Sequence, residues 1–159
     1  MRFLSGRKGQ SLVEISLMAP LILIALYIPA DFGIAFFTAQ LTQNAAREGA
    51  RIASHLPQCS VGKPPCFTNL SGEACSSTHA VVQEVCARLP NRLRNASVSV
   101  NLSAGPPCMR SVNVQVSGQY DYFFYQLVRL LGIGAPNNVA ISRATAMRYE
   151  LQPIAPPCS

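Results

Sequence analysis

The apolar positions of the chain are concentrated in one long run near the N-terminus. Residues 12–39 are predominantly apolar, and no charged residue occurs between Ile15 and Ala30. A helix over residues 12–39 is roughly 42 Å long at about 1.5 Å per residue, more than the roughly 30 Å hydrocarbon core of a bilayer. Pro57 favours the end of this helix near residue 56. We therefore predict one helix over residues 10–56, which spans a membrane over about residues 12–39.

Small and apolar residues recur at three- and four-residue spacing in the second half of this predicted helix. They are Leu41, Ala45, Gly49, Ile52, Ala53 and Leu56. Such a stripe suits close packing, either against a neighbouring helix or against the chain's own domain. The spacing leaves both alternatives open.

Shorter elements are expected after the helix. Residues 57–76 are rich in Pro, Gly, Ser and Cys, and this composition predicts a loop. A helix should follow, capped by Ser77 or Thr78 and ended or bent early by Pro90. Its predicted apolar face comprises Val81, Val82, Val85, Cys86, Leu89 and Leu93.

Alternating valines then predict an antiparallel hairpin with one buried face. The apolar members are Val98, Val100 and Leu102 in the first strand and Val112, Val114 and Val116 in the second. The aromatic run from Tyr120 to Tyr125 continues at helical spacing, which favours a place in the core. A last strand is expected over about residues 139–149. The fold class is therefore α+β: a long N-terminal transmembrane helix leads into a small antiparallel β-sheet domain with one or two packed helices.

Charge orients the predicted span. The first nine residues carry Arg2, Arg7 and Lys8 and no acid, and basic residues favour the cytoplasmic side. All six cysteines lie after residue 58, so the same orientation places them where disulfides persist. A cleaved signal peptide is disfavoured because its apolar region is only about 7–15 residues long. We expect residues 57–159 to form an exported, disulfide-containing domain.

Six cysteines allow fifteen pairings, and the sequence does not choose among them. We predict that Cys108 pairs with Cys158, because antiparallel pairing of the second hairpin strand with the last strand brings the start of one beside the end of the other. Two further bridges are left open among Cys59, Cys66, Cys75 and Cys86. The same four cysteines with His79 could bind zinc, but the ligand spacing of zinc sites is missing. We expect no metal and no cofactor.

Titratable residues are too few to favour an enzyme. The chain has two histidines, His55 and His79, and only four acids after residue 54: Glu73, Glu84, Asp121 and Glu150. No nucleophile, phosphate-loop or zinc-protease motif occurs. Eight Lys and Arg against these four acids give a mild basic excess, so no nucleic-acid partner is expected.

One segment carries a family resemblance. Lys8-Gly9-Gln10-Ser11-Leu12-Val13-Glu14 resembles the prepilin-peptidase site of type IV pilin-like proteins. In that family cleavage follows the Gly, and a Glu stands at the fifth position of the mature chain. The resemblance implies that residues 1–9 are a cytoplasmic leader, that Gln10 becomes the N-terminus, and that Glu14 neutralises the α-amino group of a neighbouring subunit.

Three further segments resemble the TadE-like pseudopilins of the tight-adherence (Flp) pilus: Asp31-Phe32-Gly33, residues 43–51 and residues 144–150. The resemblance implies a minor pilin or pseudopilin in the bacterial inner membrane, with its domain in the periplasm or in a pilus outside the cell. It would act in pilus assembly, priming or anchoring. Other pilins, a prepilin peptidase, a platform protein and a secretion ATPase are the implied partners.

A major filament subunit is disfavoured. Major Flp pilins usually carry Tyr where this chain has Ile15, and they are little more than the helix, whereas about 105 residues follow position 54 here. The alternative to the pilin interpretation is an uncleaved, single-pass anchored domain that binds an envelope ligand.

Overall fold

The computed structural model describes residues 6–59, 65–103, 109–123, 125, 132, 134 and 137–151. Its elements, in chain order, are α1 (Gly6–His55), β1 (Leu70–Ala74), α2 (Ala80–Ala87), β2 (Leu93–Leu102), β3 (Ser111–Asp121) and β4 (Asn138–Arg148). The four strands form one antiparallel sheet in the order β1-β2-β3-β4. The predicted α+β class is confirmed.

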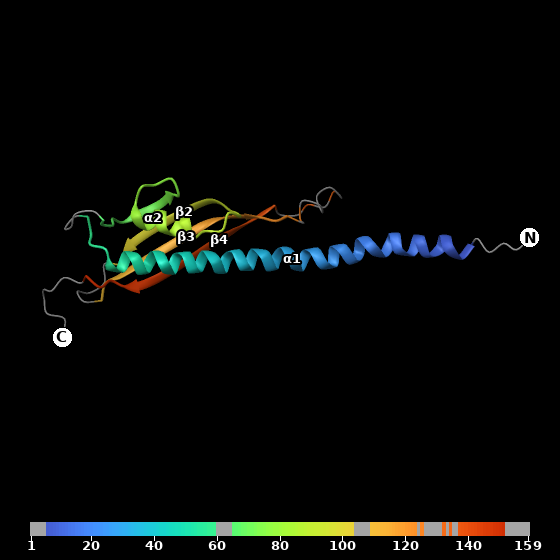
Figure 1. Ribbon diagram of the computed structural model, residues 1–159, viewed down its shortest axis with the longest axis horizontal. Helices are drawn as coiled ribbons and strands as arrows, with labels where there is room; N and C mark the ends of the chain where they lie inside the picture. Colours follow the sequence, from blue (N-terminus) through green and yellow to red (C-terminus); the bar gives the residue numbers. More distant parts are fainter. Residues whose placement is uncertain are drawn as a thin grey trace, which may run out of the picture.

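Helix α1 is much longer than the domain that it belongs to (Figure 1). Its C-terminal half lies along the sheet, whereas its N-terminal half projects beyond it. Pro20 and Pro29 lie inside the projecting half, as membrane-spanning helices tolerate. The two halves of α1 therefore have different surroundings.

The core lies between the sheet and the two helices. The valines of β2 and β3 that face inward are fully buried and pair across the strands, Val98 with Val116 and Val100 with Val114. The alternation of valines thus predicted this hairpin correctly. Strand β4 pairs antiparallel with β3 from Ser111↔Arg148 to Asp121↔Asn138, which confirms the last strand and its pairing. Cys108 and Cys158 lie outside the described residues, so their bridge stays a prediction.

The small-residue stripe of α1 packs on the chain's own domain. Ala45, Ala46, Ala50 and Ala53 are buried with Gly49 in the main core. A Cβ on Gly49 would collide with Val85 Cγ2 of α2 and would lie 3.3 Å from Val114 Cγ1 of β3. Small side chains therefore allow α1 to approach α2 and the sheet together.

The prediction of a loop over residues 57–76 is wrong in part, because β1 lies within it. This strand has one buried residue, Leu70, and so lacks the alternation that identifies strands. Gly72, at φ +67°, lies where the register with β2 shifts, and its N–H donates to Ser99 Oγ at 2.9 Å. Pairing with β2 holds this short edge strand in spite of its loop-like composition.

Helix α2 is shorter than expected. His79, rather than Ser77 or Thr78, occupies the N-cap position, without a side-chain hydrogen bond. Val81, Val82 and Val85 form the buried face as predicted, but Leu93 belongs to β2, where it pairs with Tyr120. The helix ends before Pro90 because a proline cannot continue the main-chain hydrogen bonds. Residues 126–131, expected to continue a later helix, lie outside the described residues.

Candidate functional site

The projecting half of α1 is an exposed apolar surface. Within the described part of the chain, α1 is the one helix long and apolar enough to cross a membrane. Its most apolar window of 18 residues has a mean hydropathy of 2.1, and none of that window is buried. The large apolar side chains between Leu12 and Ile28 that cover this part of the helix are exposed. This surface is suited to lipid or to other apolar helices.

The residues of the predicted processing site lie at the start of this helix. Gly9, Gln10 and Glu14 are all exposed. The side-chain amide of Gln10 donates a hydrogen bond to Glu14 Oε1 at 3.2 Å, so the helix brings these two residues together one turn apart. Among the described residues, no atom outside the helix's own backbone and the two chain neighbours comes within 4 Å of a Cβ built on Gly9. A side chain at position 9 is therefore compatible with the fold of this chain.

Asp31 marks the point at which α1 meets the domain. It is fully buried, although an acid in an apolar helix is expensive to bury without partners. Its Oδ1 accepts the main-chain N–H of Phe123 at 3.2 Å, and its Oδ2 accepts the N–H of Tyr125 at 3.3 Å. The sequence singled out Asp31-Phe32-Gly33 only as a resemblance, and the contact with the segment after β3 was missed. The available signal was an acid in an apolar run.

Aromatic rings cluster around this contact. Phe32 of α1 lies 5.9 Å from Tyr122 and 6.2 Å from Tyr125, between ring centroids. Tyr120 and Tyr122 are buried, as the aromatic run predicted, and burial raises the pKa of both. Phe123, by contrast, is 63% exposed. The run thus contributes both to the core and to the surface.

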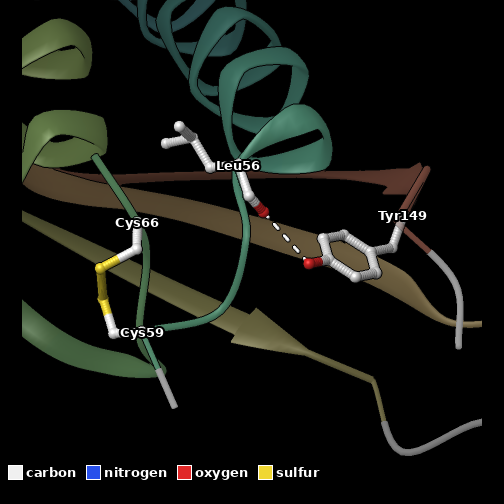
Figure 2. Close-up of a disulfide and its surroundings, with 4 residues drawn as sticks. All are labelled: Leu56, Cys59, Cys66 and Tyr149. Carbon is white, nitrogen blue, oxygen red and sulfur yellow. Dashed lines mark hydrogen bonds between the residues drawn. A yellow bond between two sulfur atoms is a disulfide. The ribbon is translucent and has the colours of Figure 1, made fainter. Parts of the chain in front are cut away.

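A second contact holds the end of α1. The hydroxyl of Tyr149 donates to the carbonyl oxygen of Leu56 at 3.1 Å (Figure 2), and the main-chain N–H of Glu150 donates to Ser54 O at 3.1 Å. These partners satisfy carbonyls that the end of a helix leaves unpaired within the helix. Farther along, the amide of Gln43 donates to Thr145 Oγ1 at 2.6 Å. The resembling segments 43–51 and 144–150 therefore belong to one packed unit.

Charged side chains continue the contact between α1 and α2. Glu48 of α1 binds Arg51 one turn on, and Arg88 at the end of α2 approaches the same carboxylate at 3.5 Å. The hydrogen bond from Arg51 lowers the pKa of Glu48, and the charge of Arg88 adds to this effect. These groups lie on the surface, where such pairs contribute little to stability.

Four of the six cysteines form two local bridges. Cys59 pairs with Cys66 (Figure 2) and Cys75 pairs with Cys86, with Cα–Cα distances of 5.0 and 5.6 Å. The cysteines weighed as zinc ligands are thus used in disulfides. Among the residues that the model describes, no group of three His, Cys, Asp or Glu side chains is placed to hold a metal ion.

Part of α1 resembles a known protein family. Residues 9–51 match the model of a family described as TadE-like protein. No curated protein and no solved structure matches the chain. The match begins at Gly9 and ends four residues before the end of α1, so it covers the exposed apolar half, Asp31 and half of the small-residue stripe. The resemblance inferred from the sequence is confirmed over residues 9–51, which are similar to the TadE-like family.

Proposed function

We propose that the chain is a minor pilin or pseudopilin that takes part in assembly, priming or anchoring of a tight-adherence type IV pilus. One observation carries the proposal: the TadE-like match coincides with a helix whose first half is an unburied apolar rod. The second half of the same helix packs into the main core of the folded domain. This division suits a subunit that is held through its N-terminal helix and presents its domain elsewhere.

The membrane-spanning segment is residues 9–30 in this proposal. These 22 residues rise about 33 Å as a helix, close to the roughly 30 Å of a hydrocarbon core. From Asp31 onward α1 buries Thr38, Ala39 and Thr42 against the domain. This proposal therefore ends the membrane span nine residues earlier than the prediction from hydropathy alone, which was residues 12–39.

The orientation follows from charge and from cysteine chemistry. Basic residues before Gly9 favour a cytoplasmic N-terminus. The two disulfides favour a domain in the oxidising periplasm, or outside the cell within a pilus.

Processing by a prepilin peptidase between Gly9 and Gln10 completes the proposal. Cleavage would create a new α-amino group at Gln10, and Glu14 of a neighbouring subunit would neutralise it within the membrane. The exposure of Gln10 and Glu14 leaves both accessible to another subunit. Partners would be other pilins, contacted through the N-terminal helix, and the pilus platform machinery.

This function is tested by blotting of the full chain. The chain carries a tag after residue 151 and is expressed with and without a prepilin peptidase. Cleavage should remove roughly 1 kDa, the share of nine residues in a 17.1 kDa chain of 159 residues. A Gly9→Val precursor is the matched control and should keep its full size. Unchanged size of the natural chain beside its peptidase would contradict the pilin interpretation and favour an uncleaved, anchored envelope-binding domain.

A further inference from the structure

The end of the domain nearest the projecting half of α1 is rich in aromatic side chains. Phe32 and Phe36 of α1 are 52% and 64% exposed, and Phe123, just after β3, is 63% exposed. Tyr122 and Tyr125 pack behind Phe32. We call these five residues the aromatic end. Figure 1 shows that the sheet's end where β3 finishes and β4 begins is the one directed toward the N-terminal half of α1.

The height of the aromatic end above the span follows from the helix geometry. If residues 9–30 fill the hydrocarbon core, Asp31 stands at its boundary. Phe36 lies five residues farther, about 7.5 Å along the helix. The headgroup layer is about 5–8 Å thick on each side, the difference between a core of about 30 Å and a bilayer of about 40–45 Å. Phe32 and Phe36 therefore fall within the headgroup layer.

Asp31 positions Phe123 at the same distance from the hydrocarbon core. Both oxygens of its carboxylate accept main-chain N–H groups from the segment after β3, those of Phe123 and Tyr125. The exposed ring of Phe123 is therefore positioned by two hydrogen bonds to the residue at the membrane boundary. Aromatic rings at this depth are typical of membrane interfaces, where apolar surface meets headgroups.

An open apolar groove adjoins the aromatic end. It has a volume of ≈ 500 Å³ and lies between α1 and the first half of β4, lined among others by Phe36, Val139, Ile141 and Arg143. Its lining is mainly apolar. Such a lining suits the apolar part of the phospholipid surface that α1 would already cross.

From this geometry we propose that the aromatic end is a membrane-docking surface, which lies in the phospholipid headgroup layer and fixes the height of the domain above the bilayer. The inference rests on the proposed anchoring by residues 9–30. It adds a second contact with lipid, made by the folded domain rather than by the helix.

The chain contains no tryptophan, so single tryptophans report one site each. The full-length Phe123→Trp, Leu21→Trp and Met109→Trp variants are reconstituted separately into phosphatidylcholine–phosphatidylglycerol vesicles. The lipids carry bromine either close to the headgroup or deep in the chain. All three positions are exposed, so the substitutions leave the core unchanged. Met109, 75% exposed and close before β3, is at the opposite end of the sheet and is the matched control.

The expected result is graded by depth. Leu21→Trp should lose emission chiefly with deep bromines, Phe123→Trp chiefly with shallow ones, and Met109→Trp with neither. Emission of Phe123→Trp should also shift to the blue relative to Met109→Trp.

Three outcomes overturn the proposal and are distinguishable. If Leu21→Trp is quenched but Phe123→Trp behaves like Met109→Trp, the helix is an anchor and the domain does not touch lipid. If Leu21→Trp is not quenched either, the anchoring assumed in the proposed function fails as well. A blue shift of Phe123→Trp that depends on protein density, without quenching by bromine, would assign the surface to a second copy of the chain instead.

Discussion

The carboxylate of Asp31 accepts a hydrogen bond from the main-chain N–H of Phe123 at 3.2 Å, across 92 positions of the sequence. The same carboxylate accepts the N–H of Tyr125. One buried side chain thus joins the middle of a 50-residue helix to the end of the sheet. Among residues 9–30 of α1 no residue is buried and Tyr27 alone is partly buried, whereas after Asp31 the helix becomes part of the domain.

Replacement of Asp31 by Ala should destabilise the domain, because it leaves two main-chain N–H groups without the acceptor that they have now. A buried donor that loses its partner costs about 1–3 kcal/mol. Urea unfolding in detergent micelles, followed by circular dichroism, measures the loss. Asp31→Asn keeps one carbonyl oxygen and should lose less.

Asp121→Ala is the matched control for this prediction. Its carboxylate is partly exposed and binds the exposed Arg94, so its removal should cost less than about 1 kcal/mol. Equal unfolding midpoints for Asp31→Ala and the natural chain would show that the contact does not stabilise the domain.

Gly49→Ala should destabilise the domain by overpacking, in spite of the higher helix propensity of alanine. The added methyl group would collide with Val85 Cγ2, and overpacking of a core costs typically about 1–3 kcal/mol. In the Gly49→Ala/Val85→Ala double variant the added methyl group has room. The double variant should therefore lose less unfolding free energy than the sum of the losses of the two single variants. Strict additivity would contradict the close approach.

Gly33→Ala is the control in the same helix. Within the part of the chain that the structure describes, no side chain or distant backbone lies within 4 Å of a Cβ at this position. Because glycine is the poorer helix former by about 1 kcal/mol, Gly33→Ala should be neutral or stabilising.

Removal of the Cys75–Cys86 bridge should weaken the attachment of α2 to β1. The bridge closes a separation of 11 residues, and loop closure of this size is worth roughly 3 kcal/mol in the unfolded-state model. The Cys75→Ala/Cys86→Ala variant should lose about this much in urea unfolding. Removal of Cys59–Cys66, with a separation of 7, should cost slightly less. A larger loss for the shorter loop would contradict the loop-closure account.

Most of the fold could be predicted because its signals are local. Alternating valines identify β2 and β3, and a long uncharged apolar run identifies α1. Strand β1 could not be predicted, since its pairing with β2, rather than its own composition, makes it a strand. The packing of the Gly49 stripe was ambiguous for a similar reason: small residues suit a neighbouring subunit and the chain's own valines equally well.

The candidate site divides in the same way. Gly9, Gln10 and Glu14 were predicted from the spacing of a sequence motif, and their role in processing and assembly stays a prediction. The role of Asp31 could not be predicted, because its partners are main-chain N–H groups, which every residue except proline offers. Nothing in the side chains of Phe123 and Tyr125 indicates such a partner.

Tyr149 should make stability depend on pH in the alkaline range. Burial raises the pKa of its hydroxyl, whereas an unfolded tyrosine ionises near pH 10. Its contribution is therefore complete below about pH 10 and is lost as the pH rises toward the folded-state value. Unfolding free energies measured from pH 7 to pH 11 should fall more steeply for the natural chain than for Tyr149→Phe.

At pH 7 the same Tyr149→Phe variant loses the hydrogen bond to Leu56 O, worth about 0.5–1.5 kcal/mol. Parallel profiles for Tyr149→Phe and the natural chain would contradict the assignment.

Glu14 and Gly9 should have separable functions in the proposed pilin. Gly9→Val should block cleavage, because a side chain there obstructs the peptidase rather than the fold of this chain. Glu14→Val removes a charge from a membrane helix, so insertion should become easier. Incorporation should fail instead, because the amine of a neighbouring subunit loses its partner where an unpaired charge is costly.

Glu14→Gln sharpens this prediction, because an amide can keep the hydrogen bond with Gln10 but carries no charge. If charge is what matters, Glu14→Gln should be cleaved, stable and absent from pili, as Glu14→Val is. Ser16→Val, which removes a polar group two residues away without changing charge, should assemble normally. Size on a blot reports cleavage, and blotting of sheared pili or of membrane complexes reports incorporation. Normal incorporation of Glu14→Val together with full activity of Gly9→Val would contradict the pilin interpretation and leave the uncleaved anchor in its place.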